Sequence, residues 1–186
     1  MKTRFTVTLV GLLLVAAANA SAQWLVGLTG GATMSDFSNP DTKSRWGYTA
    51  GLFAGRATYR SITSLEVRYI QKGGEGARID YVETGLTAGG LAGGSRGVRG
   101  GGYGGVMVAF PVSCSEETTF SVGLFCDNTN TEWSLPVGIL LGKFNERGGF
   151  VGIDASYQFA MSDASLEVFN NTWVFRFVIG KPSGRR

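Results

Sequence analysis

The side chains best suited to chemistry in this chain are charged residues that alternate with apolar ones. They are Glu66, Arg68, Glu83, Glu132, Asp154 and Arg176. Such groups can transfer protons, bind ions, or neutralise and hydrogen-bond one another. The 186-residue sequence contains no histidine, the side chain that most often activates serine or water near neutral pH. No Ser–Lys or paired-carboxylate spacing stands out in its place, so we predict no enzyme and no catalytic residue.

These charges lie in segments that are apolar at every second position. The pattern is clearest between Glu132 and Ile179, where Leu140 is the one apolar residue on the polar face of the first repeat. A period of two is typical of a β-strand with one apolar and one polar face. We predict strands near Trp24–Thr33, Gly47–Tyr59, Thr63–Gln71, Ile79–Ala88, Gly102–Val112, Thr131–Lys143, Gly149–Ala160 and Asn171–Gly180.

The N-terminus predicts export. Lys2 and Arg4 precede an apolar core, and Ala20-Ser21-Ala22 matches the small-residue cleavage pattern of a secretory signal. We therefore predict a signal peptide over residues 1–22 and one domain over residues 23–186. Beyond the signal, no uninterrupted apolar stretch is long enough for a membrane-spanning helix.

Long alternating strands behind an export signal predict an all-β protein, an eight-stranded antiparallel up-and-down transmembrane β-barrel in a bacterial outer membrane. Short periplasmic turns usually lie opposite longer outer loops. We therefore expect the N-terminus on the periplasmic side, with Gly89–Gly101 longer than a periplasmic turn should be. The outer connectors would be Met34–Trp46, Lys72–Arg78, Ser113–Asn130 and Met161–Asn170, and the other inner ones Arg60–Ile62 and Phe144–Gly148.

The two faces of the strands have different expected roles. A charge on the lipid side costs about 2–4 kcal/mol at mid-bilayer, so we place the charged set in the lumen as an internal salt-bridge plug. A narrow conducting path or small-ligand site is the alternative. Aromatic rings near strand ends suit the lipid headgroups. We assign the lipid-facing girdle to Trp24, Tyr69, Trp133, Tyr157, Trp173, Phe175 and Phe177, with Tyr59, Tyr81 and Phe159 near strand ends as well.

The two cysteines, Cys114 and Cys126, both fall in the long third outer loop. An even count in an exported chain predicts a disulfide. Two cysteines in a chain without histidine are too few for a structural zinc site. We predict no metal and no cofactor.

The run from Gly93 to Gly105 is rich in glycine and contains Arg96, Arg99 and Tyr103. Such runs can stack bases and contact phosphates. An exported protein meets little RNA, however, and glycine is natural at turns and close strand contacts. We predict no nucleic-acid partner.

Three stretches carry a resemblance to a known family. Leu65–Gly73, Ile79–Glu83 and Gly152–Tyr157 are similar to the third, the fourth and a later strand of the small outer-membrane β-barrel family (porin-like, OmpA/OmpX-type) of Gram-negative bacteria. The resemblance covers nearly all of the mature chain. It implies an eight-stranded barrel and an outer-membrane location, and it implies no substrate.

Together these features predict a non-enzymatic outer-membrane protein with a structural or surface-interaction role, because binding usually resides in loops held by a rigid scaffold. The expected partners are outer-membrane lipid, the barrel assembly machinery and an extracellular ligand of unknown identity. The first alternative is a narrow porin for small solutes. The second is a secreted soluble barrel that binds a small apolar ligand, which would need its apolar face inside.

Overall fold

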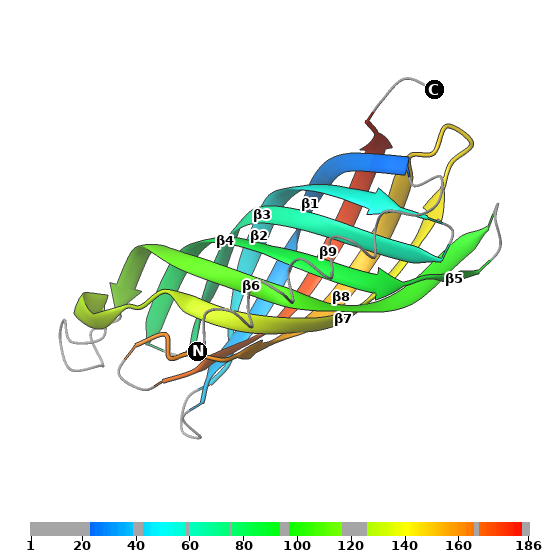
Figure 1. Ribbon diagram of the computed structural model, residues 1–186. Helices are drawn as coiled ribbons and strands as arrows, with labels where there is room; N and C mark the ends of the chain where they lie inside the picture. The colour runs from blue at the N-terminus through cyan, green and yellow to red at the C-terminus, as the bar shows by residue number, and fades with distance from the viewer. Residues whose placement is uncertain are drawn as a thin grey trace, which may run out of the picture.

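The computed structural model of the chain is a closed β-barrel (Figure 1). It describes residues 23–38, 43–58, 60–74, 76–93, 97–116, 126–165 and 168–183, so the predicted signal peptide lies outside the described residues. Within these ranges the barrel wall has eight strands. They are β1 (Gln23–Phe37), β2 (Arg45–Ala57), β3 (Ser61–Gly74), β4 (Ala77–Gly90), β6 (Val98–Glu116), β7 (Glu132–Phe144), β8 (Phe150–Ala160) and β9 (Asn170–Pro182).

Each wall strand pairs antiparallel with its neighbours in sequence, and β1 pairs with β9 to close the barrel. A two-residue strand, β5 (Ala92–Gly93), pairs with the start of β6. This up-and-down topology confirms the predicted fold class. A 3₁₀ turn, η1 (Cys126–Asn128), follows β6. No helix in the described part of the chain is long and apolar enough to cross a membrane.

Most of the wall alternates between an outward and an inward face, most regularly in β7, β8 and β9. Along β9, the exposed residues are Trp173, Phe175 and Phe177, and the buried residues between them are Val174 and Arg176. The exterior is the apolar face around the barrel: Phe177 is 69% exposed and Ile139 66%. Water-soluble barrels bury this face, so the wall has the polarity of a membrane barrel.

The two ends of the barrel differ in their connections. We call one the turn end, because its hairpins are short: Thr58 N–H donates to Ser61 O (2.8 Å), and Asn145 N–H donates to Gly149 O (2.8 Å). The predicted connector Gly89–Gly101 is also shorter than expected, since β4 runs to Gly90 and β6 begins at Val98. Strand β9 ends at this end (Figure 1).

The opposite end, which we call the loop end, carries the longer connections, but one predicted connector is wrong. The sequence predicts an outer connector over Lys72–Arg78, whereas β3 continues to Gly74 and β4 begins at Ala77. Only residues 75–76 join the strands. Gly76 adopts a φ of 91°, a left-handed conformation that glycine adopts without strain. Lys72 is consequently a strand residue.

Two apolar clusters fill the lumen from either end. At the turn end, buried side chains pack together as the turn-end plug, which comprises Leu25, Phe53, Ala57, Leu91, Leu140, Phe150 and Val178. At the loop end a second cluster contains Ile70, Ile79, Tyr81, Ala109, Ala164 and Val174. The turn-end plug lies to one side of the charged residues, whereas the loop-end cluster is interleaved with them, since Ile70 lies between Arg68 and Lys72 on the inner face of β3.

Candidate functional site: the charged lumen

Strand register places opposite charges side by side in the lumen. Arg68 on β3 pairs with Glu83 on β4, and Asp154 on β8 pairs with Arg176 on β9. Arg68 Nε donates to Glu83 Oε2 (2.6 Å), and Arg176 Nε donates to Asp154 Oδ1 (2.9 Å). Directly opposed residues bring their Cβ atoms within about 5 Å. The sheet itself thus sets these ion pairs.

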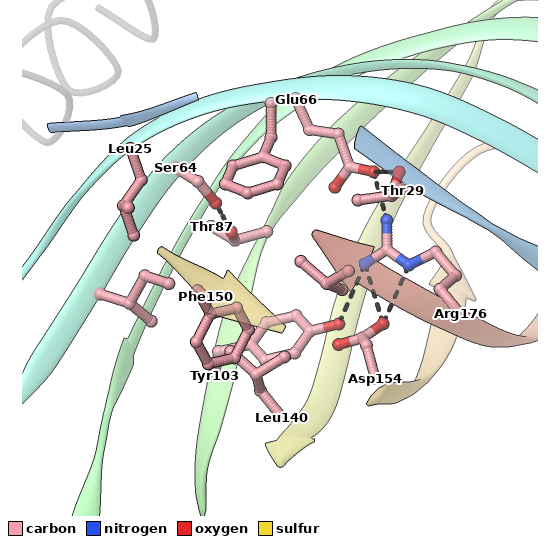
Figure 2. A pocket seen from close by; sticks show the side chains of 13 residues that line it. Leu25, Thr29, Ser64, Glu66, Thr87, Tyr103, Leu140, Phe150, Asp154 and Arg176 are labelled. Carbon is pink, nitrogen blue, oxygen red and sulfur yellow. Dashed lines mark hydrogen bonds and ion pairs between the residues drawn. The ribbon is translucent and has the colours of Figure 1, made fainter. Parts of the chain in front are cut away.

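Arg176 organises the half of the lumen nearer the turn end (Figure 2). Its guanidinium binds Asp154 on one side and forms a close ion pair with Glu66 on the other. Thr29 Oγ1 donates to the same Glu66 carboxylate (3.3 Å), and Arg176 Nη2 lies 3.5 Å from the Tyr103 hydroxyl. We call these five residues the Arg176 cluster.

Lys72 organises the half nearer the loop end. Its Nζ donates to Glu132 Oε1 (2.5 Å) and lies 3.1 Å from Glu83 Oε1. Glu83 also accepts from Arg68 and from Gln158 Nε2 (3.1 Å). Glu83 and Glu132 are 0% exposed. Lys72, Arg68, Glu83, Glu132 and Gln158 form the Lys72 cluster.

The two clusters form one chain of charge, because Arg68 Nη1 lies 3.6 Å from Glu66 Oε1. All six charged residues singled out from the sequence are buried in it. Lys72 is the member that sequence reasoning missed. Among the described residues the connected chain holds one more carboxylate than cations: Glu66, Glu83, Glu132 and Asp154 against Arg68, Lys72 and Arg176.

A small cavity separates the Arg176 cluster from the turn-end plug. Its volume is about 50 Å³. A cavity needs about 10–15 Å³ of such volume per water, so this one accommodates a few water molecules. Its polar wall includes Ser64 and Thr87, whose hydroxyls lie 2.8 Å apart, and Leu140 and Phe150 close it toward the turn end (Figure 2).

The aromatic residues assigned to the lipid-facing girdle lie on the outer wall. Trp24 is 52% exposed, and Tyr69 and Tyr157 are half-buried. Tyr157 packs edge-on against Trp173, with 4.9 Å between ring centroids. Their contact with headgroups stays a prediction. Four more are exposed to between 41% and 69%: Trp133, Trp173, Phe175 and Phe177.

Tyr81 corrects one of the other aromatic assignments. It was expected near the headgroups, but it is 0% exposed and lies in the lumen, where its ring centroid is 5.5 Å from Lys72 Nζ. A register shift between Asp80 and Tyr81 accompanies its position. Phe159 is exposed as expected, and Tyr59 lies outside the described residues.

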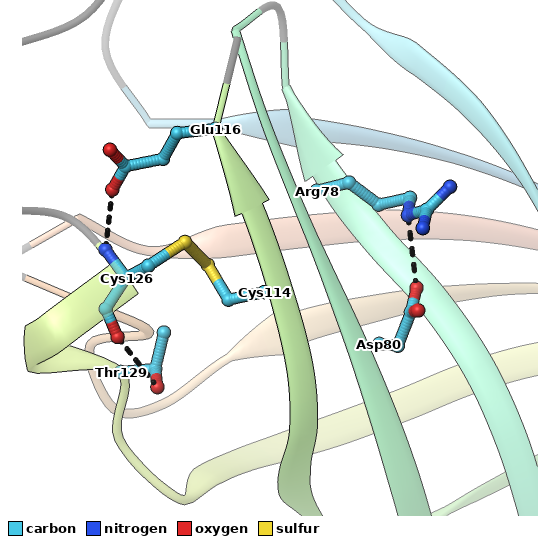
Figure 3. Close-up of a disulfide and its surroundings, with 6 residues drawn as sticks. All are labelled: Arg78, Asp80, Cys114, Glu116, Cys126 and Thr129. Carbon is cyan, nitrogen blue, oxygen red and sulfur yellow. Dashed lines mark hydrogen bonds and ion pairs between the residues drawn. A yellow bond between two sulfur atoms is a disulfide. The ribbon is translucent and has the colours of Figure 1, made fainter. Parts of the chain in front are cut away.

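The predicted disulfide is present and holds the loop end (Figure 3). Cys114, near the end of β6, is bonded to Cys126 at the start of η1. The backbone N–H of Cys126 donates to Glu116 Oε1 (2.5 Å). The covalent bond therefore fixes η1 against the extended end of β6.

The lumen has the composition of a structural network. Its carboxylates bind cationic side chains, which leaves them occupied as ion-pair partners. Among the residues that the structure describes, no group of three or more His, Cys, Asp or Glu side chains could hold a metal ion. What the arrangement does chemically is pair buried carboxylates with buried cations inside a closed wall.

Fold and lumen together define a closed, eight-stranded antiparallel barrel with a charge-paired interior. Comparison with solved structures agrees: Neisserial surface protein A (NspA) superposes with a TM-score of 0.55 at 14% identity, covering 88% of this chain and 100% of NspA. The outer-membrane protein AlkL matches at 0.47 and 10% identity, covering 91% of this chain and 93% of AlkL.

The N-terminal barrel domain of Pseudomonas aeruginosa OprF matches at 0.46 and 13% identity, covering 86% of this chain and 99% of that domain. Only NspA of these three exceeds 0.5, so the comparison rests on it. At this identity it shows the fold, and the fold is that of the small outer-membrane barrels the sequence resembles. No protein-family profile and no curated protein matches the chain.

Proposed function

We propose that this chain is a non-enzymatic outer-membrane β-barrel, exported by residues 1–22, whose working face is its loop end. The observation that carries the proposal is the inverted polarity of the wall. Ion pairs occupy the lumen, while large apolar side chains such as Leu52, Ile139 and Phe177 are more than 60% exposed. Only a hydrocarbon solvent favours that arrangement. It is the reverse of what a soluble apolar-ligand barrel needs.

The filled lumen favours a structural or surface-interaction role over that of a porin. The cavity beside Arg176 is about 50 Å³ and is bounded by the turn-end plug. The loop-end apolar cluster is interleaved with the charges of the Lys72 half of the lumen. A solute would have to displace both apolar clusters and break buried ion pairs. We therefore expect no stepwise conductance in planar bilayers; selective conductance altered by Glu66→Gln or Arg176→Met would support the channel alternative instead.

The loop end is the part best suited to meet an extracellular ligand. It carries the longer connections, and the Cys114–Cys126 bond and the Glu116–Cys126 hydrogen bond hold one of them to the barrel. Restraint of a loop lowers the entropy lost on binding. The identity of the ligand is not determined by these features.

Membrane fractionation tests the location. The full chain should appear in the outer-membrane fraction and shift in mobility on boiling before electrophoresis. Ile139→Arg puts a charge on the exposed wall, at an expected cost of up to about 2–4 kcal/mol, and should reduce the folded band. Glu146→Arg, in an exposed turn, is the matched control and should not. Recovery of native protein in the soluble periplasm would overturn the proposal.

A further inference from the structure

The outer wall is hollowed at one place near the turn end. A groove of about 870 Å³ crosses β9, β1, β2 and β3. Ala54 has the smallest of the outward-facing side chains that line the groove, and larger apolar side chains surround it. The outward-facing lining comprises Val26, Leu28, Leu52, Ala54, Leu65, Val67, Ile179 and Lys181.

Strand register fixes the direction of the groove. Lys181 lies opposite Val26, Val26 opposite Ala54, and Ala54 opposite Leu65. This row spans four strands, or about 14 Å at about 4.8 Å per interval. It climbs from the turn-end rim into the wall, since Lys181 is the penultimate residue of β9 whereas Leu65 lies well inside β3.

The end of the groove nearest the turn-end rim is basic. Lys181 is exposed and lines it directly. Arg56 lies two residues beyond Ala54 on the same face of β2, and its guanidinium carbon is 5.5 Å from the ring centroid of Trp24. An apolar channel ending at two cations and an interfacial tryptophan matches the chemistry of an anionic lipid.

We propose that this groove binds one anionic phospholipid, with an acyl chain along the Val26–Ala54–Leu65 row and its phosphate between Lys181 and Arg56. The inference rests on the proposed membrane location and adds the turn-end leaflet as the source of the lipid. Barrel strands tilt by 35–45°, so a row across them also inclines to the membrane normal, as an acyl chain entering from the headgroups must.

A second copy of the chain fits this groove less well. A two-fold interface centred on it would bring the same surface patch of each copy together, so Lys181 and Arg56 would face their own equivalents. Like charges in such a position are unfavourable. Charge complementarity therefore favours a lipid phosphate.

The wall offers its own control. A second groove, of about 430 Å³, crosses β7, β8, β9 and β1, and Ala155 is among its small residues. The cation in its lining, Arg176, belongs to the lumen network. This groove has apolar walls but no exposed lysine equivalent to Lys181. Comparing the two grooves therefore distinguishes packing of an acyl chain from recognition of the phosphate charge.

Native mass spectrometry of the full chain in detergent micelles tests the proposal, with dipalmitoyl-phosphatidylglycerol and dipalmitoyl-phosphatidylcholine as probes. The wild-type chain should retain one phosphatidylglycerol in preference to phosphatidylcholine. Lys181→Gln and Arg56→Gln should each reduce that preference about fivefold. Lys181→Arg, which keeps the positive charge, should retain the preference for phosphatidylglycerol. Ala54→Leu, which fills the groove, should weaken binding of both lipids.

The controls are Lys143→Gln, exposed on β7 at the same end, and Ala155→Leu in the second groove. Equal losses in these variants, or a preference unchanged by Lys181→Gln, would overturn the inference. A dimer that excludes lipid would do the same. Every variant is also tested for the mobility shift on boiling. If the wild-type chain shows no shift, the proposed membrane location is wrong. If it shows the shift but no preference for phosphatidylglycerol, only the proposed lipid site is wrong.

Discussion

The two halves of the lumen solve the problem of buried charge differently. In the Lys72 cluster, two cations meet two carboxylates, Glu83 and Glu132, and the set is fully buried. In the Arg176 cluster, Arg176 binds both Glu66 and Asp154, Arg68 of the other cluster lies 3.6 Å from Glu66, and a cavity of about 50 Å³ adjoins the set. Buried charge requires partners, whereas room for water can replace some of them. The excess carboxylate lies in the cluster that adjoins this cavity.

Removing Lys72 should give the largest loss. Lys72→Met leaves Glu132 without its cation in the closed half of the lumen, and breaking a buried pair in this way costs about 3–5 kcal/mol. Urea unfolding in lipid vesicles, followed by tryptophan fluorescence, measures the free energy of unfolding. Lys143→Met on the outer wall is the control and should change it by about 0.5 kcal/mol or less. Similar values for the two variants would contradict the Lys72 cluster as drawn.

Reduction of the disulfide should rank next and act at the loop end. The bond closes a short loop, with a sequence separation of 12, and the chain-entropy model gives about 3 kcal/mol for a loop of this order. The urea midpoint is measured with and without reductant. In the double variant Cys114→Ser, Cys126→Ser the reductant should have no further effect; a residual effect would point to some other target.

Removing Arg176 should cost less than removing Lys72, about 2–3 kcal/mol, because the adjoining cavity lets water solvate Glu66 and Asp154. The same urea assay applies to Arg176→Met, with the exposed turn residue Arg147→Met as control. A loss larger than that of Lys72→Met would reverse the comparison between the two halves.

Gly138→Ala should give the smallest change, about 1–2 kcal/mol. A Cβ at Gly138 would come within 2.6 Å of Ser156 Cβ and 2.7 Å of the Tyr103 ring, so β8 at Ser156 and the tyrosine that contacts Arg176 must both move. Gly102→Ala is the control, since its Cβ would meet only the Gly138 carbonyl oxygen, at 3.8 Å. Equal midpoints for both variants would show that Ser156 and Tyr103 both shift without loss of stability.

Much of the wall could be predicted from sequence because alternation is a local property. The period of two in β7, β8 and β9 separates exposed Val137 and Ile153 from buried Asp154 without any knowledge of strand pairing. The six lumen charges followed from the same rule. Which charge meets which depends on register, and register is set across the whole sheet.

The sequence predictions that were wrong concern the inner face of the strands. They share one cause, because the lumen is not polar along its whole length. The sequence predicts Lys72-Gly73-Gly74 as part of an outer connector, whereas β3 continues through them and Lys72 lies on its inner face beyond the apolar Ile70. Leu140, the one apolar residue on the polar face of its repeat, belongs to the turn-end plug. An apolar residue at a polar-face position near the end of a strand is therefore a sequence signal for such a plug.

The pairing of β1 with β9 has a consequence for how the molecule is made. This seam joins the first and last strands, and a hydrogen bond across it links Ser35 to Thr172, 137 residues apart. Until β9 exists, β1 presents an unpaired edge to any other strand. Contacts this distant in sequence also form slowly. A nascent or truncated chain therefore needs protection of β1, and shielding that one strand should suppress aggregation more than shielding β6 or β7.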